Sequence, residues 1–304
     1  MRDSHRERTG TDPALDIRRL SGSLGAELRG IDLADPSPGD FDTILDLFAE
    51  HQVLLFPDQH LSTDEHLAFG RRFGTLEGHP HLTETSEVQE IFELRSSGGG
   101  VADEWHSDLT CMPEPSVMSI VQMVTCPDVG GDTMWSSQYA AYEQLSPPMQ
   151  DLCEGLSALH DAHPHDRPGQ MAIHPVVRVH PVTGRRSLFV NEHFTRRIVE
   201  LSHDESEMLL GYLSRWAASP RFGVRYHWTA GTVAMWDNRC TQHCVLDDFD
   251  DERVLRRVTI MGDRPEPAVP PRWEPALISG ARGGGGRHDR QLGRFLASQR
   301  GDNR

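Results

Sequence analysis

Two potential metal ligands lie close together in the segment Trp105–Asp108 (sequence WHSD): they are His106 and Asp108. If this segment is extended, residues i and i+2 project from the same side, so one imidazole and one carboxylate could share a metal ion. The chain has 17 histidines, and a His-x-Asp pair arises often by chance in such a sequence. A surface loop is therefore the alternative interpretation.

A second histidine, His243, ends the segment Trp236–His243 (sequence WDNRCTQH), which follows a β-like run at 232–236. Two histidines and one carboxylate leave three coordination positions open, which is typical of non-haem iron(II) oxygenases. Zinc is the competing metal, because Cys240 and Cys244 could supply thiolates. The chain lacks a second closely spaced cysteine pair, which disfavours a closed structural zinc site. The alternative for both cysteines is ordinary burial as small side chains.

Two arginines, Arg253 and Arg257, stand four residues apart at a predicted strand, 254–261. Positions four apart on a strand face the same side. One interpretation is a surface network of ion pairs with the acidic run at 247–252. The other is that the acidic run is solvated and that both arginines project inwards to bind two different acids, because a buried cation requires an anion.

All 30 basic residues are arginines, because the sequence contains no lysine. This excludes Schiff-base catalysis by a lysine amine and nucleotide binding by a Walker-type lysine. Arginine stays protonated and binds carboxylates, phosphates or sulfonates through paired N–H groups. The formal net charge of −16 disfavours nucleic acid as a partner, because phosphate contacts require a basic face.

The elements that must position these residues are mostly short strands. β-rich runs lie at 24–33, 53–56, 116–124, 132–135, 175–180, 187–190, 224–228, 232–236 and 254–261. Helices are predicted at 40–50, 138–145, 149–159 and 204–217, and after Ser62, where Glu65 completes a capping box. Because βαβ alternation is absent, this pattern predicts a mainly β fold with flanking helices, either an antiparallel barrel or a sandwich.

The length of 304 residues and the 37% hydrophobic content allow a sizeable core. We predict a disordered N-terminus at 1–15, a single domain at 16–279 and a flexible Gly/Arg-rich tail at 280–304. No apolar run approaches the ~18 residues of a membrane span, and the polar first residues lack the apolar segment of a secretory signal. Five irregularly spaced cysteines argue against a disulfide framework. We therefore expect a cytoplasmic protein without a membrane partner.

Six segments, in consistent order between about Leu20 and Asp263, resemble the taurine dioxygenase family (TauD/TfdA). They are WHSD at 105–108, GGDTMW at 130–135, HPVVR at 174–178, LFVNE at 188–192, WDNRCTQH at 236–243 and RVTIMGD at 257–263. Members of that family are Fe(II)- and 2-oxoglutarate-dependent oxygenases. The resemblance therefore implies an oxidoreductase that uses iron, 2-oxoglutarate and O2, and it implies the double-stranded β-helix, or jelly-roll, fold.

The resemblance also assigns roles to individual residues. His106, Asp108 and His243 match the iron ligands of the family. Arg253 matches the arginine that pairs with the distal carboxylate of 2-oxoglutarate, and Thr133 matches the hydroxyl that assists it.

Further positions match the family's substrate pocket. Arg257 matches the arginine that receives the anionic group of taurine, His79 matches a substrate-contacting histidine, and Phe194 matches an aromatic wall. Two polar contacts to taurine are replaced, by Leu82 where the family has a tyrosine and by Ala102 where it has an asparagine. These differences argue against taurine, and the presence of Arg257 favours another anion.

The resemblance implies hydroxylation of a C–H bond of a small anionic molecule (a sulfonate, sulfate, phosphate ester or carboxylate), with release of succinate and CO2. Where the hydroxylated carbon carries the heteroatom, the product collapses to an aldehyde. The segment at 161–173 is shorter than the family's lid, which motivates an alternative. This is a tailoring hydroxylase or desaturase of secondary metabolism, acting on an amino acid, a nucleotide or a carrier-bound intermediate. By analogy with relatives we expect a homo-oligomer, a dimer or tetramer.

Overall fold

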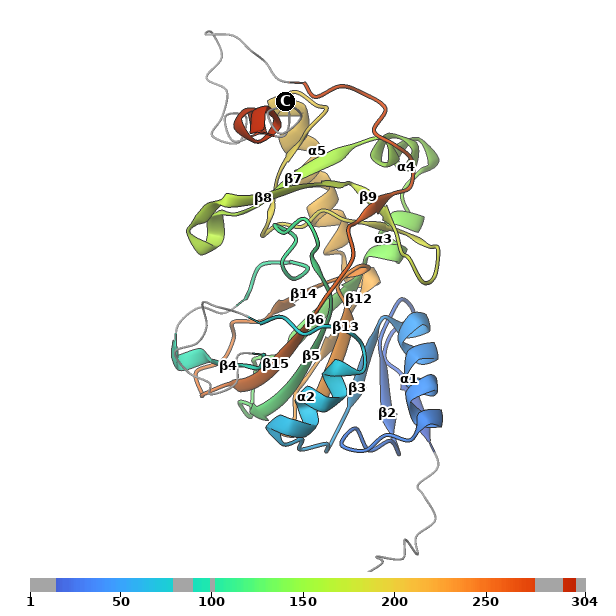
Figure 1. Ribbon diagram of the computed structural model, residues 1–304, viewed down its shortest axis with the longest axis vertical. Coiled ribbons are helices and arrows are strands. Elements are labelled where there is room, and N and C mark those ends of the chain that lie inside the picture. Colours follow the sequence, from blue (N-terminus) through green and yellow to red (C-terminus); the bar gives the residue numbers. More distant parts are fainter. Residues whose placement is uncertain (1–14, 79–89, 99–101, 277–291, 299–304) are drawn as a thin grey trace, which may run out of the picture.

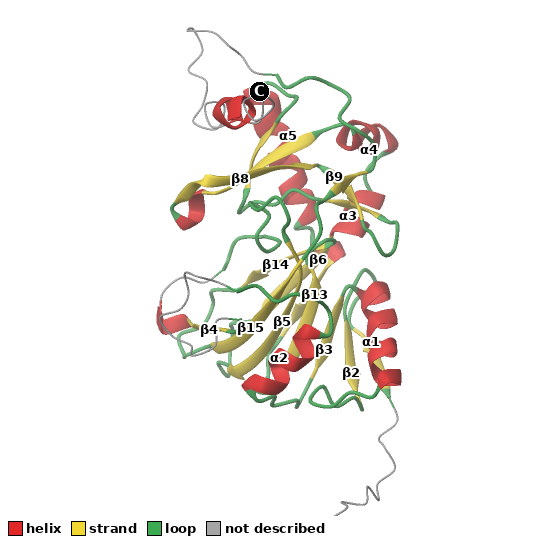
Figure 2. Cartoon of the chain, viewed as in Figure 1, coloured by secondary structure: helices red, strands yellow, loops and turns green. Residues whose placement is uncertain are grey.

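The computed structural model describes residues 15–78, 90–98, 102–276 and 292–298. Figure 1 shows an elongated molecule with two halves. One half holds the largest sheet together with helices α1 (Pro38–His51) and α2 (Thr63–Arg71). The other half holds helices α3 (Gln138–Glu143), α4 (Pro147–Glu154) and α5 (His203–Ala217) with smaller sheets. Figure 2 shows that strands dominate the first half.

The larger sheet has seven strands in the order β1-β2-β3-β13-β5-β15-β4. They are β1 (Asp16–Arg19), β2 (Ala26–Arg29), β3 (Val53–Phe56), β13 (Val233–Asp237), β5 (Ser116–Thr125), β15 (Val254–Met261) and β4 (Phe92–Arg95). Strands β2 and β3 pair in parallel, and the other neighbours are antiparallel.

A smaller antiparallel sheet, in the order β12-β6-β14, packs against the larger one. Its strands are β12 (Gly223–Tyr226), β6 (Thr133–Ser137) and β14 (Thr241–Val245). One buried cluster joins the two sheets, with Trp135 and Tyr226 from the smaller sheet and Val121 and Trp236 from the larger. The prediction of a mainly β fold with flanking helices is confirmed.

Helices α1 (Pro38–His51) and α2 (Thr63–Arg71) cover the outer face of the larger sheet. Their apolar faces place Phe48 and Phe69 in one cluster with strand residues such as Ile120 and Val258. Both helices begin with a capping box, at Ser37 and at Ser62, and the box at Ser62 and Glu65 is the one that the sequence predicts.

The other half contains two three-stranded sheets, β11-β7-β8 and β10-β9-β16. The strands are β7 (Ser157–Ala162), β8 (Arg167–Pro175), β9 (Val177–Val179), β10 (Arg186–Leu188), β11 (Thr195–Ile198) and β16 (Glu266–Pro267). The helices are α3 (Gln138–Glu143), α4 (Pro147–Glu154) and α5 (His203–Ala217), with short 3₁₀ turns η1 (Ser96–Gly98), η2 (His163–His165) and η3 (Pro220–Phe222). A separate buried cluster that includes Tyr142, Val177 and Leu213 packs these elements together.

The predicted helix at 149–159 is wrong in its second part. Helix α4 ends at Glu154, and Gly155 is its C-cap. Ser157 is already the first residue of β7, where it pairs with Pro175 of β8. Pairing with β8 and β11 makes this segment a strand, and a helical pattern read from the segment alone does not register that pairing. The predicted lid at 161–173 is the end of this β7–β8 hairpin with η2 at its turn.

The predicted tail at 280–304 includes one described segment, residues 292–298, which is helical. Its Leu292 is fully buried against Leu159 and Val199. Residues 1–14 lie outside the described residues. Among the described helices, none is long and apolar enough to cross a membrane.

Candidate functional site

His106 and His243 lie on adjacent backbone segments. Each donates its backbone N–H to the carbonyl of the other, at 3.0 and 2.8 Å, which forms an isolated antiparallel bridge between the 102–108 segment and β14. Asp108 follows two residues after His106, and its Oδ1 lies 3.7 Å from His106 Nε2 and 4.0 Å from His243 Nε2. The structure therefore brings together the three residues predicted to bind a metal, all of them buried.

The two imidazole rings are oriented by different contacts. Nδ1 of His106 hydrogen-bonds the carbonyl of Glu104 at 2.8 Å, which directs Nε2 towards Asp108. The ring of His243 packs between the rings of His106, at 4.1 Å between centroids, and Trp236, at 4.6 Å. Nδ1 of His243 is buried and has no hydrogen-bond partner within the described residues.

The two carboxylate oxygens of Asp108 have different partners. Oδ2 accepts hydrogen bonds from Ser119 Oγ at 2.6 Å and from Asn238 Nδ2 at 3.2 Å. Oδ1, the oxygen that faces both imidazoles, accepts one from Arg257 Nη1 at 3.2 Å. Asn238 is held in turn by Trp236, whose Nε1 donates to the Asn238 amide oxygen at 3.0 Å.

Electrostatics keep these three side chains in the protonation states that a metal requires. Burial lowers the pKa of both His106 and His243, so both are neutral ligands at neutral pH. Burial alone would raise the pKa of Asp108, but the Arg257 guanidinium and the hydrogen bond from Ser119 hold it well below its usual range. Two neutral imidazoles and one ionised carboxylate, whose Oδ1 faces both rings, fit a divalent metal such as iron(II).

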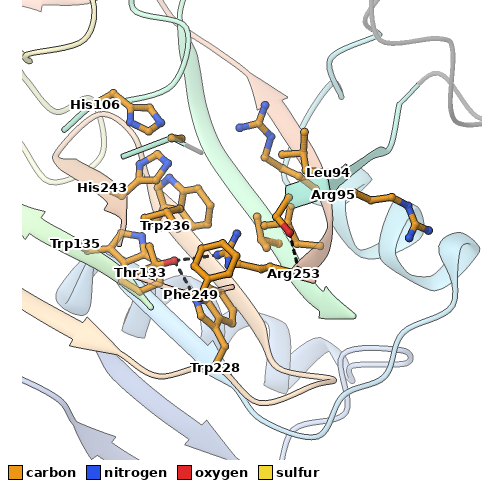
Figure 3. Close-up of a pocket in the computed structure, with 16 residues that line it drawn as sticks. Leu94, Arg95, His106, Thr133, Trp135, Trp228, Trp236, His243, Phe249 and Arg253 are labelled. Atoms are coloured by element: carbon orange, nitrogen blue, oxygen red, sulfur yellow. Dashed lines mark hydrogen bonds between the residues drawn. The ribbon is translucent and has the colours of Figure 1, made fainter. Parts of the chain in front are cut away.

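A pocket of about 220 Å³ extends from these histidines between the two sheets (Figure 3). At its other end Arg253 Nη2 donates to Thr133 Oγ1 at 3.3 Å, and Arg253 Nε donates to the carbonyl of Gly131 at 3.1 Å. Trp228 Nε1 also donates to Thr133 Oγ1, at 2.9 Å. With two donors already on its oxygen, the Thr133 hydroxyl keeps its own proton for an acceptor in the pocket.

Arg253 remains a cation in this setting. Burial lowers the pKa of Arg253 to about 10, which still leaves the guanidinium protonated at neutral pH. The acidic run at 247–252 is exposed, and its Asp248 and Glu252 pair instead with Arg225 and Arg95. The arrangement matches the predicted inward-facing arginines and not the alternative of a surface ion-pair network.

The turn before β6 shapes the Arg253 end of the pocket. Gly130 and Gly131 both have left-handed backbone conformations, with φ of +79° and +65°. The N–H of Gly131 donates to Asp248 Oδ1 at 2.9 Å. A Cβ on Gly130 would stand 2.2 Å from the backbone oxygen of Asp248, so only glycine fits this position.

The predicted substrate-binding residues are placed only in part. Arg257 and Ala102 both line the pocket. Phe194 is buried in a small cluster with Cys111 and Ala162, its ring lies 4.6 Å from that of His193, and it is not among the residues that line the pocket. His79 and Leu82 lie outside the described residues.

A second group of potential ligands, His180, Asp237 and Cys240, is also buried. Its carboxylate is already engaged, because Arg239 donates to both Asp237 oxygens at 2.9 and 2.6 Å and His180 Nε2 lies 2.9 Å from Oδ2. Burial raises the pKa of Cys240 well above its ordinary value and that of Cys244 to about 12, so both sulfurs are protonated thiols. This favours the interpretation of both cysteines as ordinary buried residues.

Sequence reasoning missed the contacts that hold the site together. Asn238 and Gly131 lay within recognised motifs, which could have drawn attention to them. Ser119 and Trp228 carried no such signal, because their contacts form between segments 11 and 95 residues apart.

The fold and this donor set define a class: the chain is a 2-oxoglutarate-dependent dioxygenase with a jelly-roll fold. It belongs to the family described as "Taurine catabolism dioxygenase TauD, TfdA family", whose sequence pattern matches residues 16–259.

Named relatives support the same assignment. An "Alkylsulfatase" of Acinetobacter baylyi is 36% identical, and the match covers 82% of this chain and 86% of that protein. An "Alpha-ketoglutarate-dependent sulfate ester dioxygenase" of Pseudomonas putida is 33% identical, and the match covers 83% of this chain and 91% of that protein. The crystal structure of a taurine dioxygenase from Burkholderia xenovorans superposes with a TM-score of 0.77 at 36% identity, covering 84% of this chain and 94% of that one. The predicted family and jelly-roll fold are confirmed.

Proposed function

We propose that the chain oxidises a small alkyl sulfate ester at the carbon bound to the ester oxygen. His106, Asp108 and His243 hold Fe(II), and Arg253 with Thr133 holds the distal carboxylate of 2-oxoglutarate. The observation that carries the substrate class is the position of Arg257, whose Nη1 lies 3.2 Å from the Asp108 oxygen that faces both imidazoles. A sulfate group on Arg257 would place its nearest C–H bonds beside the metal.

The two relatives named above act, by their names, on sulfate esters, and Arg257 supplies the matching cation here. Guanidinium N–H groups pair with tetrahedral oxyanions in a fixed geometry. Ala102 at the pocket wall leaves room for an alkyl chain, since its side chain offers no hydrogen bond.

The residues of this chain position the reactants and exclude water. Thr133 donates its hydroxyl proton to the 2-oxoglutarate carboxylate that Arg253 binds, and Trp228 fixes the threonine by its own hydrogen bond. Bound iron, with O2 and 2-oxoglutarate, supplies the oxidising power for C–H hydroxylation. The hydroxylated ester then breaks its C–O bond, which yields an aldehyde and sulfate beside succinate and CO2. Arg257 stabilises the sulfate that leaves.

Succinate formation tests this function. With Fe(II), 2-oxoglutarate and O2, we expect a small alkyl sulfate to yield equal amounts of succinate, sulfate and aldehyde, and to do so faster than an alkyl sulfonate, a phosphate ester or an amino acid. Arg257→Met removes the charged partner of a desolvated anion, so kcat/KM for the sulfate should fall by roughly 30-fold or more, or about 2–5 kcal/mol.

Arg256→Met is the matched control, because Arg256 is the adjacent residue and pairs with Glu93 at 3.2 Å on the other side of β15. Binding of Mn(II) to each variant separates loss of the anion site from loss of the metal site. Unchanged turnover in Arg257→Met would contradict the anion-binding role. It would favour the tailoring-enzyme alternative, as would a preference for the amino acid.

A further inference from the structure

Four aromatic rings form a continuous row that begins at a predicted metal ligand. The ring of His243 contacts Trp236, with 4.6 Å between centroids. Trp236 contacts Trp135 at 5.8 Å, and Trp135 contacts Trp228 at 6.0 Å. Trp228 contacts Tyr226 at 5.9 Å. We call Trp236, Trp135, Trp228 and Tyr226 the aromatic row.

The row crosses the core between the two sheets. Its three tryptophans succeed one another from the metal end of the pocket to the Arg253 end in Figure 3. All four side chains belong to the cluster that joins the sheets, and each successive pair lies at a separation typical of rings in contact. Every contact from His243 to Tyr226 is therefore a contact between two aromatic rings.

The row ends at an ion pair on the molecular surface. The Tyr226 hydroxyl donates to Glu27 Oε2 at 3.4 Å, and Glu27 accepts from the exposed Arg18 at 2.8 Å. Although burial raises the pKa of Glu27, its contacts with Arg18 and Arg29 lower it overall, so this carboxylate is ionised. Burial raises the pKa of Tyr226 to about 12, so the phenol keeps its proton until it is oxidised.

We propose that the aromatic row carries one-electron oxidation away from the metal site when no substrate is bound. Tryptophan and tyrosine are the side chains most easily oxidised by one electron without loss of the backbone. Electron transfer between rings weakens steeply with distance and is rapid between rings in contact. A row of such rings therefore offers the metal centre an electron source other than its own ligands.

Bound iron with O2 and 2-oxoglutarate would supply the oxidant, with one oxygen atom entering succinate, CO2 released and the second oxygen atom left to be reduced. Trp236 would give this oxidant one electron, and successive transfers along the row would leave Tyr226 one electron short. The oxidised phenol, a strong acid, would give its proton to the Glu27 carboxylate. A donor in solution such as ascorbate would return the electron to Tyr226, and Glu27 would return the proton. A second electron along the same row, with two protons from solvent, would complete the reduction of the remaining oxygen atom to water and restore Fe(II).

The inference rests on the proposed metal site, and freeze-quench EPR tests both. Full-length protein with Fe(II) and 2-oxoglutarate is mixed with O2 in the absence of sulfate ester and ascorbate. We expect a tyrosyl radical in the wild type and its loss in Tyr226→Phe. Ring-deuterated tyrosine should narrow the wild-type signal, which distinguishes it from a tryptophanyl radical.

Tyr142→Phe is the matched control. Tyr142 is also buried and also donates to a carboxylate, that of Glu154, and its pKa is likewise raised to about 12. It packs in the other half of the molecule, outside the cluster that contains the row. The radical should persist in this variant.

Trp135→Phe provides a second variant should Tyr226→Phe fail to fold, because it interrupts the row and leaves Tyr226 in place. It should also lose the tyrosyl signal. A signal of unchanged yield in either variant overturns the proposal. Succinate without any organic radical in the wild type also overturns it, while leaving the proposed metal site intact. Absence of both succinate and radical overturns the metal site and this inference together.

Discussion

At the scale of single residues, the two oxygens of Asp108 serve different purposes. Oδ2 is occupied by Ser119 and Asn238, so that only Oδ1 is directed at the two imidazoles. Hydrogen bonds of this kind fix the orientation of a ligand and tune its affinity for a metal. The metal affinity of the site should therefore depend on residues that never touch the metal.

Replacement of Ser119 by alanine tests this dependence. Ser119→Ala removes the shorter of the two hydrogen bonds to Oδ2, and partners of this type contribute about 10–100-fold to metal affinity. We expect a loss of that size in Mn(II) affinity, measured by titration with EPR detection of free Mn(II). Ser116→Ala is the control, because Ser116 lies on the same strand and accepts from the same Asn238, at 3.0 Å. Equal affinity in the two variants would refute the role.

That His106, Asp108 and His243 lie together, and Thr133 with Arg253, could be predicted from the sequence, but their supporting contacts could not. His106, Asp108, His243 and Thr133 stood in motifs that are continuous in the sequence, and Arg253 stood four residues before one. The bond from Ser119 to Asp108 and that from Trp228 to Thr133 exist only because strands pair across the core. A local pattern of residue types contains no record of such pairing.

At the scale of elements, prediction succeeded where the burial pattern was local. β15 was predicted with its observed bounds, because hydrophobic residues interrupted by arginines mark a strand with two different faces. β14, which carries His243, was not predicted. Its sequence TQHCV places polar side chains on both faces, and these are buried through contacts with β6 and the 102–108 segment.

The turn before β6 supports a prediction at this scale. Gly130→Ala introduces a Cβ at 2.2 Å from Asp248 O in a left-handed conformation, so the turn must shift and carry Gly131 O away from Arg253. We expect a loss of about 1–3 kcal/mol in the free energy of unfolding and a raised KM for 2-oxoglutarate. Urea denaturation and succinate assays measure the two effects.

Gly184→Ala separates backbone strain from steric displacement. Gly184 also has a left-handed φ, of +68°, but nothing lies within 4 Å of its added Cβ. This variant should lose some stability and keep the KM of the wild type. If both variants raise the KM equally, the turn before β6 has no particular role in binding 2-oxoglutarate.

At the scale of the whole molecule, the core contains histidines that fold in the neutral form. Burial lowers the pKa of His66 and of His174 from 6.5 to about 4. Below pH 6.5 the unfolded chain binds a proton at each position, whereas the folded chain does not until the pH approaches 4. The free energy of unfolding should therefore decrease as the pH falls through this window, by about 1.4 kcal/mol per pH unit for each such group.

A comparison of His66→Gln with the wild type measures this effect at one position. Glutamine can still donate to the carbonyl of Ile120, which His66 Nε2 contacts at 3.1 Å, but it cannot be protonated. Urea denaturation at pH 7 and pH 5 should show that the free energy of unfolding falls less in this variant than in the wild type. His60→Gln, a change at an exposed position, should lose as much stability between pH 7 and pH 5 as the wild type does. An equal loss in all three proteins would contradict the expectation.

The backbone bridge between His106 and His243 has a consequence for how this site can be lost. Because side chains alternate along a strand, inserting or deleting one residue between Asn238 and His243 would turn the imidazole to the opposite face. Gln242 or Cys244 would then point at Asp108, with every ligand still present in the sequence. A related sequence with such an insertion or deletion would contain all three ligand residues and yet encode a protein unable to bind the metal. The number of residues between Asn238 and His243 therefore identifies an active relative better than the presence of the ligands does.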